Sequence, residues 1–271
     1  MTKSNGKAHR YNPEADDRKY EGLKDKIALE RMVMLLKPRS DESALDVGTG
    51  KGNAALKLAP LVREVTAIDY APGTEVIFQN VPSGNCRYLR FDLTDGKLPV
   101  EDTSMNIVVC RAALHHIKSK PTFFEEAFRV LRPGGRLFIM DPVMSPSLRF
   151  AWSIISKVAE QDYQAYCTRE ELADFTVRSG FKQISEERFP FKRWMDDWIN
   201  AKITEVDQRG KEVLGPFAKY VRKTIKTIVT EDFPRELQTE LNLRQEDEKW
   251  VFDYDCRELL LTKALEHAAG P

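Results

Sequence analysis

The stretch A-L-D-V-G-T-G-K-G-N, from Ala44 to Asn53, governs the interpretation of the whole chain. It opens with three strand-forming apolar residues around one acid, and three glycines follow at every second position, 48, 50 and 52. A run compatible with a helix starts at Ala54. Glycine permits positive φ angles and lets a ligand lie against bare backbone. The stretch therefore predicts a strand, a ligand-binding turn and a helix.

The glycine spacing argues against a bound phosphate. The dinucleotide pattern G-x-G-x-x-G needs a glycine where Asn53 stands, and the pattern G-x-x-x-x-G-K-[ST] fails because Lys51 is followed by Gly52. Asp46 would repel a phosphate but suits a ligand with an ammonium or sulfonium group. Asp69 ends the next predicted strand, where an acid can accept hydrogen bonds from a ribose diol. Together these residues predict S-adenosylmethionine, a cationic amino-acid nucleoside without phosphate.

Five motifs follow one another along the chain. They read L-D-V-G-T-G-K-G-N at 45–53, A-I-D-Y at 67–70, F-D-L at 91–93, N-I-V-V-C-R-A-A-L-H-H-I at 106–117 and L-R-P-G-G-R-L-F-I-M-D-P at 131–142. With these motifs the chain resembles the class I S-adenosylmethionine-dependent methyltransferases, in the group that includes the ubiquinone and menaquinone biosynthesis methyltransferases. The resemblance covers roughly residues 40–190. It implies an enzyme that transfers a methyl group from S-adenosylmethionine to a small, apolar or aromatic metabolite.

The same motifs imply which residues contact the cofactor. The expected set is Asp46, Gly48, Thr49, Gly50, Asn53, Asp69, Tyr70, Asp92, Leu93 and Arg111. Within it, Asp92 resembles the family position where an acid meets the adenine amino group, and Leu93 the apolar neighbour that packs on the ring. A capping or solvated role for Asp92 at the end of its strand is the alternative.

Two histidines and an acid are the candidate catalytic residues. His115 and His116 follow the predicted fourth strand, and Asp141 ends the fifth. Ligands of open α/β sheets bind outside the carboxyl ends of the strands, so these residues are expected beside the methyl donor. An imidazole can remove a proton from an acceptor hydroxyl or activated carbon near neutral pH. Alternatively, the histidines form only the pocket wall, and Asp141 caps the turn at Pro142.

The predicted fold is α/β: a doubly wound, Rossmann-like sheet of seven mostly parallel strands with an antiparallel last strand, plus helical lid insertions. Helical periodicity and strand runs divide the chain into four parts. These are an N-terminal helical cap (1–40), the cofactor-binding core (41–189), an inserted helical segment (190–249), and the last core strand with its tail (250–271). The inserted segment is expected to be either a substrate lid or a dimer interface.

Composition limits the other classes of function. The chain has 42 acidic and 42 basic residues, so no net field attracts nucleic acid or an anionic membrane. It has no run of about 18 apolar residues and no signal-peptide pattern, which predicts a cytoplasmic protein without a membrane span. Its 4 cysteines form no C-x-x-C pair, so no metal is expected.

Two other functions stay open on the sequence. An RNA or protein methyltransferase is one, because four basic residues share one face of the inserted segment: Lys219, Arg222, Lys223 and Lys226. A solvated helix face is the preferred explanation of that pattern. The other is a homologue that binds the cofactor without transferring its methyl group.

Overall fold

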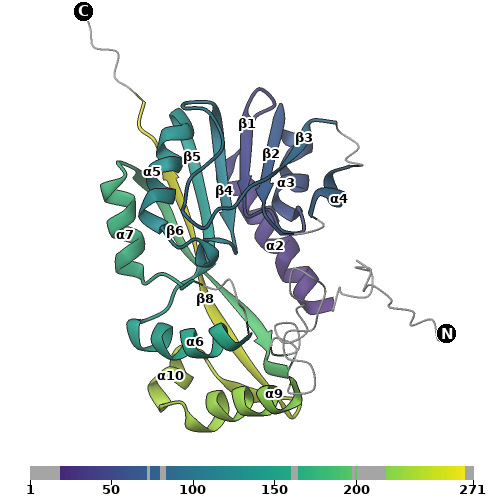
Figure 1. Ribbon diagram of the computed structural model, residues 1–271, viewed down its shortest axis with the longest axis vertical. Helices are drawn as coiled ribbons and strands as arrows, with labels where there is room; N and C mark the ends of the chain where they lie inside the picture. Colours follow the sequence, from purple (N-terminus) through teal and green to yellow (C-terminus); the bar gives the residue numbers. More distant parts are fainter. Residues whose placement is uncertain are drawn as a thin grey trace, which may run out of the picture.

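The computed structural model describes residues 19–71, 74–79, 84–159, 164–196, 199 and 218–265. Figure 1 shows two parts: a twisted sheet with helices on both faces, and below it a smaller group of helices around the far ends of two long strands. We call this second part the lower lobe; it contains α6 (Pro146–Ala159), α9 (Ala218–Thr227) and α10 (Arg235–Glu240).

The strands run in the spatial order β3-β2-β1-β4-β5-β8-β6, and a short strand, β7, pairs with β8 outside this path. Their bounds are β1 Ser43–Val47, β2 Glu64–Asp69, β3 Cys86–Arg90, β4 Met105–Arg111, β5 Leu131–Pro142, β6 Lys182–Trp194, β7 Arg244–Glu246 and β8 Lys249–Thr262. Strands β1 to β5 pair in parallel, whereas β8 is antiparallel to both β5 and β6. The predicted doubly wound sheet with an antiparallel last strand is confirmed, and β7 is an addition to the seven predicted strands.

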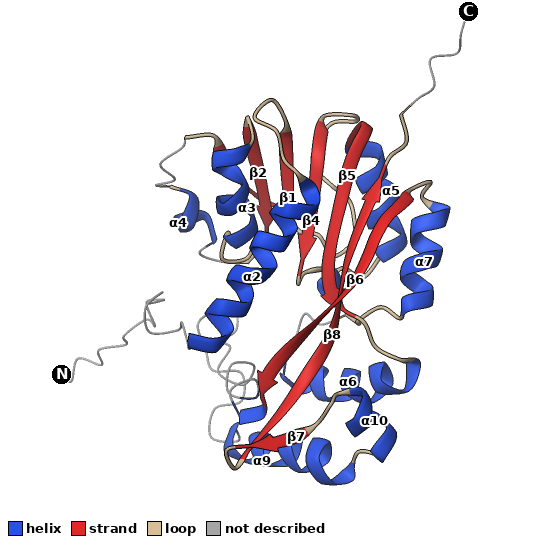
Figure 2. Ribbon diagram, turned by 180° about the vertical axis from the view of Figure 1, so that it is seen from behind, coloured by secondary structure: helices blue, strands red, loops and turns tan. Residues whose placement is uncertain are grey.

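The central strands are buried on both faces, because helices cover both sides of a parallel sheet. Alternate residues of β1 enter different cores: Ala44 faces one, whereas Leu45 and Val47 face the other. Helices α2 (Lys19–Leu36) and α3 (Asn53–Leu58) cover the first face. Helices α5 (Lys120–Val130) and α7 (Arg169–Arg178) cover the second (Figure 2). A short helix, α4 (Thr74–Phe78), and two 3-10 turns, Ala59–Leu61 and Leu114–His116, complete the upper part.

The lower lobe is built on the continuation of β6 and β8. These strands stay paired from Lys182↔Thr262 to Trp194↔Val251. Trp152 of α6 and Phe252 of β8 are fully buried there and belong to the same core as α2. A π-helical turn, Ile228–Asp232, directly follows α9 and leads to α10. The predicted boundary at residue 189 therefore falls inside a strand, and much of the predicted insertion, 197–198 and 200–217, lies outside the described residues.

None of the helices in the described part of the chain is both long enough and apolar enough to cross a bilayer.

Candidate active site

The three glycines all adopt the left-handed conformation, with φ of 67° at Gly48, 51° at Gly50 and 76° at Gly52. A Cβ added to Gly48 would lie 2.4 Å from the Cβ of Ala113, so this glycine lets the segment after β4 approach the turn. A Cβ on Gly50 would meet no atom within 4 Å. The backbone at Gly50 thus faces open space, as a turn that receives a ligand requires.

Asp46 holds the glycine turn from behind. Its Oδ2 accepts hydrogen bonds from Thr49 Oγ1 at 2.6 Å and from the Ala55 backbone N–H at 2.9 Å. Burial raises the pKa of Asp46 to about 6, although the bond from Thr49 opposes the rise. Asp46 and Thr49 do not line the cavity described next. Their direct contact with the cofactor stays a prediction; the contacts that the structure shows stabilise the turn.

A cavity of about 240 Å³ opens at the carboxyl ends of β1, β2 and β4. It is lined by Gly48, Gly50, Asp69, Tyr70, Ala71, Leu93, Thr94, Ala112, Ala113, His116 and Ile117. Five of the predicted cofactor residues, Gly48, Gly50, Asp69, Tyr70 and Leu93, thus meet at one place. Five further lining residues were not predicted from the sequence, although each directly follows or lies within one of the five motifs: Ala71, Thr94, Ala112, Ala113 and Ile117.

The donor and acceptor groups of this cavity fit S-adenosylmethionine. The carboxylate of Asp69 accepts from Gly50 N at 2.7 Å and from Ala71 N at 2.9 Å, one bond on each oxygen. A carboxylate accepts about four hydrogen bonds, so both oxygens keep capacity for the two hydroxyls of a ribose. Leu93 and Ile117 supply apolar surface, and none of the described residues that line this cavity is a Lys or Arg that would attract a phosphate.

Asn53 and Arg111 contact a residue that the sequence argument did not identify. Asp25 of α2 accepts from Arg111 Nη1 at 2.5 Å and from Asn53 Nδ2 at 2.9 Å. One carboxylate thereby joins α2, the start of α3 and the end of β4. Asp25 and Arg111 are 86 positions apart, and no local pattern marks such a pair. Cofactor contacts by Asn53 and Arg111 stay predictions.

Asp92 is exposed and accepts a hydrogen bond from the Thr94 backbone N–H at 2.8 Å. Hydrogen bonds from Thr94 lower the pKa of Asp92, so it is ionised at neutral pH. This is the capping arrangement considered above as the alternative. A contact between Asp92 and the adenine stays a prediction.

The structure pairs His115 with Asp141. His115 Nδ1 lies 2.9 Å from Asp141 Oδ1, and the two residues are 7% and 2% exposed. Asp141 Oδ2 is buried without a hydrogen-bond partner among the described residues. The recorded bond of Asp141 is therefore to His115 and not to the turn at Pro142. A histidine that donates its Nδ1–H to a carboxylate presents Nε2 as a proton acceptor.

Aromatic rings enclose this pair on two sides. The rings of His115 and His116 have centroids 4.1 Å apart, and that of Tyr166 lies 4.8 Å from His115. His116 lines the cofactor cavity and His115 lies behind it. A buried histidine–carboxylate pair thus lies next to a residue of the cavity, and a catalytic role for His115, His116 and Asp141 stays a prediction.

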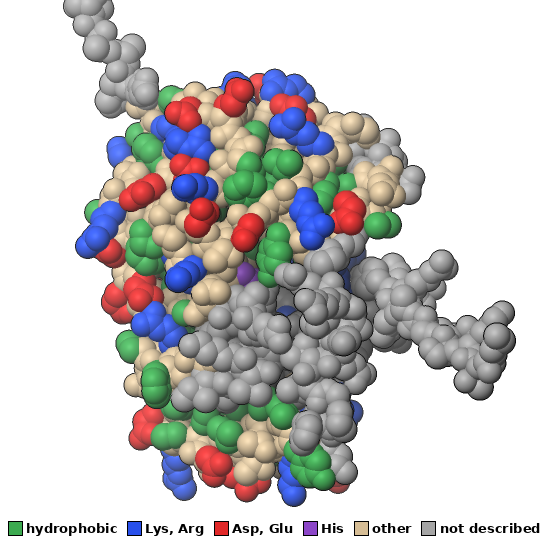
Figure 3. All heavy atoms as spheres, in the orientation of Figure 1, with side chains coloured by type: hydrophobic (Ala, Val, Ile, Leu, Met, Phe, Trp, Pro, Cys, Tyr) green, Lys and Arg blue, Asp and Glu red, His purple; other side chains and the backbone are tan. Residues whose placement is uncertain are grey.

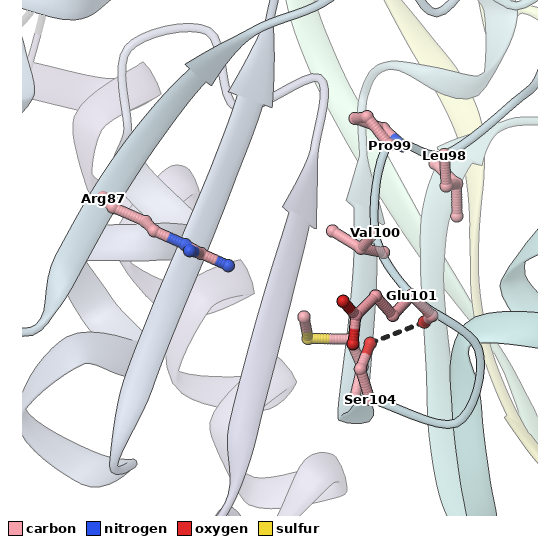
Figure 4. A pocket seen from close by; sticks show the side chains of 7 residues that line it. Arg87, Leu98, Pro99, Val100, Glu101 and Ser104 are labelled. Carbon is pink, nitrogen blue, oxygen red and sulfur yellow. Dashed lines mark hydrogen bonds between the residues drawn. The ribbon is translucent and has the colours of Figure 1, made fainter.

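A larger hollow, of about 530 Å³, lies elsewhere and does not contribute to this site. It is lined by Arg87, Leu98, Pro99, Val100, Glu101, Ser104 and Met105. Figure 4 shows Arg87 on its strand, well separated from the loop in which Ser104 Oγ donates to the Glu101 carbonyl. Met105 begins β4, so the hollow is at the end of that strand opposite to Arg111 and the cavity. Its hydroxyl, that of Ser104, donates to a backbone carbonyl and not to the Glu101 carboxylate, so the described lining pairs no nucleophile with a base.

Metal chemistry finds no support in the described part of the chain. No cluster of three or more His, Cys, Asp or Glu side chains there is suited to hold a metal ion. All four cysteines, Cys86, Cys110, Cys167 and Cys256, are free thiols.

Comparison with known proteins agrees with this geometry. The family described as "Methyltransferase domain" matches residues 45–139. An uncharacterized methyltransferase of Mycobacterium bovis is 34% identical over 138 residues, which are 49% of this chain and 67% of the relative. A demethylmenaquinone methyltransferase of Porphyromonas gingivalis is 24% identical over 189 residues, 59% of this chain and 76% of that protein.

The fold is shared with a solved structure, that of the YcgJ protein from Bacillus subtilis. The two superpose with a TM-score of 0.72 at 20% identity, over 89% of this chain and 100% of the other. S-adenosylmethionine is accordingly the cofactor of the site. The chain belongs to the class I S-adenosylmethionine-dependent methyltransferases.

Proposed function

We propose that this enzyme methylates an acidic hydroxyl, such as that of a phenol or quinol, on a small apolar metabolite. The observation that carries the proposal is the buried His115–Asp141 pair beside the cofactor cavity. A hydroxyl must lose its proton when it accepts a methyl group. A histidine oriented by a carboxylate is suited to take that proton, which contributes about 10² to 10⁴-fold to a rate.

Each part of the site has a defined task in this proposal. S-adenosylmethionine supplies a methyl group that its sulfonium readily releases to a nucleophile. Asp69 and the backbone at Gly50 orient the nucleoside, and the apolar residues Leu93 and Ile117 exclude water. His115 accepts the hydroxyl proton on Nε2, while Asp141 holds the ring through Nδ1. The geometry favours His115 over His116 as the base, because Asp141 fixes the orientation of His115.

The surroundings of the histidines support an aromatic acceptor. Tyr166, which packs on His115, has its ring 5.8 Å from that of Tyr254, and Tyr254 contacts Trp152 at 5.7 Å and Phe252 at 5.2 Å. These buried rings form a row from His115 into the lower lobe. Aromatic side chains favour planar apolar ligands through offset and edge contacts. The name of the Porphyromonas gingivalis relative, demethylmenaquinone methyltransferase, agrees with a quinone-type ring.

The described surface gives less support to a nucleic-acid substrate. Lys226, one of the four residues of the predicted basic face, pairs with Asp196 at 2.8 Å. The face seen in Figure 3 carries acidic and basic side chains interspersed, without a patch of one sign. We assign the described part of the predicted insertion, together with the other helices of the lower lobe, to closing the acceptor site, and dimer formation through it is the alternative.

The test begins with calorimetric titration of S-adenosylmethionine and S-adenosylhomocysteine into the wild-type protein and Asp69→Ala. Binding that is lost in a folded Asp69→Ala variant supports the cofactor assignment at this cavity. Acceptors are then screened with a labelled methyl donor, using phenols and quinols beside RNA and protein fractions. Transfer to a phenol or quinol supports the proposal. Transfer to RNA or protein, or cofactor binding without transfer to any class, overturns it.

A further inference from the structure

A lysine lies buried next to the proposed base. Lys120, the first residue of α5, is only 8% exposed, and its Nζ donates to the Ile117 carbonyl at 2.8 Å. No carboxylate of the described residues lies within 4.0 Å of this ammonium group. Lysine is rarely buried without an ionic partner, because removing its charge from water is costly. The position therefore calls for an explanation beyond the single hydrogen bond.

Asp141 presents the complementary situation. It is buried with one side-chain bond, to His115, and its Oδ2 has no partner in the described structure. The two groups share a neighbour, Cys167. Its backbone pairs with Val143, two residues beyond Asp141. The charge of Asp141 raises the pKa of its thiol and that of Lys120 lowers it, although burial is the main cause of the raised pKa. The ammonium group and the carboxylate thus occupy one buried region without direct contact.

We propose that Lys120 is a positioning residue for methyl transfer, whose buried positive charge balances the Asp141 carboxylate and so keeps His115 neutral. This inference rests on the proposed role of His115. With Lys120 present, an ionised Asp141 and a neutral imidazole give a region without net charge. Without Lys120 the same pair would carry one uncompensated negative charge at low dielectric. Protonation of His115 would cancel that charge, and the ring could no longer accept a proton.

The other ionisable groups around the pair do not supply the same compensation. They are Cys110 on β4, Cys167 before α7, Cys256 on β8, Arg193 on β6, Glu171 on α7, Arg149 on α6, Tyr166 and His116. Burial raises the pKa of all three thiols, that of Cys167 to about 12, so they are neutral at physiological pH. Arg149 and Glu171 pair with each other at 2.5 Å and cancel. Arg193 has further interactions of its own. Among the described residues, Lys120 is a cation beside the turn at 114–116 without an ionic partner.

The experiment compares two substitutions with a matched control. Lys120→Met removes the charge and the bond to Ile117, whereas Lys120→Gln removes the charge but keeps an N–H donor. Lys118→Met is the control, because Lys118 is exposed and lies two residues earlier, in the bend before α5. The primary readout needs no acceptor substrate. It is the pH midpoint for protonation of the His115 ring, monitored by NMR in protein labelled with ¹⁵N-histidine.

Both Lys120 variants are expected to raise that midpoint by about one pH unit, a tenfold gain in proton affinity, and the control leaves it unchanged. The acidic limb of the kcat/KM profile should move upward by the same amount, without a change in the KM for S-adenosylmethionine. An unchanged His115 midpoint in either folded variant overturns the inference. A shifted midpoint in a protein that methylates no hydroxyl supports the charge balance and refutes the proposed function instead.

Discussion

The two sides of the active site are held together in different ways. On the cofactor side, the carboxylates of Asp46 and Asp69 accept hydrogen bonds from backbone N–H groups at most 19 positions away. On the acceptor side, His115 and Asp141 bind each other through side chains, and the rings that surround them come from segments as distant as Tyr166 and Tyr254. Local backbone contacts define what binds on the first side, and tertiary packing defines it on the second.

The contrast between the two sides would be tested most strongly by removing the proposed base, His115. His115→Gln preserves an amide hydrogen-bonding group near Asp141 but accepts no proton, so kcat should fall by about 10² to 10⁴-fold, or about 3 to 5 kcal/mol. Affinity for S-adenosylmethionine should stay within about twofold, since the cofactor side is untouched. The measurement is steady-state kinetics with titration calorimetry. His116→Gln serves as the partner variant: if it loses more activity than His115→Gln, the base is His116.

The glycine turn should respond in stability. Gly48→Ala places a Cβ 2.4 Å from Ala113 Cβ in a left-handed conformation. We expect a loss of about 2 to 4 kcal/mol in the free energy of unfolding, from strain and overpacking together. Gly84→Ala is the matched control, because Gly84 has a φ of 64° with no atom within 4 Å of an added Cβ. It should lower the free energy of unfolding by about 1 to 2 kcal/mol. Urea denaturation measures both, and equal losses would show that the contact with Ala113 is unimportant.

Cofactor affinity distinguishes Asp69 from Asp92, two acids that the sequence predicts to contact different parts of the cofactor. Asp69→Asn removes the charge and one acceptor from the cavity, so the Kd for S-adenosylmethionine should rise about 10- to 100-fold, or about 1.4 to 2.7 kcal/mol. Asp92→Asn alters an exposed residue engaged with Thr94 and should change the Kd by less than about threefold. Calorimetry decides the matter. A larger effect at position 92 would move ribose or adenine recognition to that residue.

A further expected effect is the pH dependence that Asp46 confers on stability. Burial raises its folded-state pKa from 3.8 to about 6, so the folded protein binds more protons than the unfolded chain between these values. Its contribution to stability therefore increases as the pH falls from 7 towards 4, by about 2 kcal/mol. Asp46→Asn should remove this component. Denaturation of both proteins across that range measures it, and parallel curves would contradict the expectation.

The difference between the two sides also explains what could be predicted. The glycine turn, the strand ending in Asp69 and the succession of strands and helices follow from short-range patterns, which explains why the predicted fold agrees with the structure. His115, His116 and Asp141 were each identified singly, but which histidine meets the acid depends on how the turn at 114–116 packs. Asp25, β7 and the length of β6 could not be predicted, because pairing partners far apart in sequence determine them.

The long pairing of β6 with β8, whose register shifts between Gln183 and Ser185, has a mechanical consequence. A hinge between the upper sheet and the lower lobe would have to bend or break a hydrogen-bonded ladder that runs from Lys182↔Thr262 to Trp194↔Val251. Rigid separation of two lobes is therefore a costly way to admit an acceptor. We expect access to be controlled by the helices that pack on these two strands. Movement of the helices costs less free energy than bending the paired strands, which stay rigid.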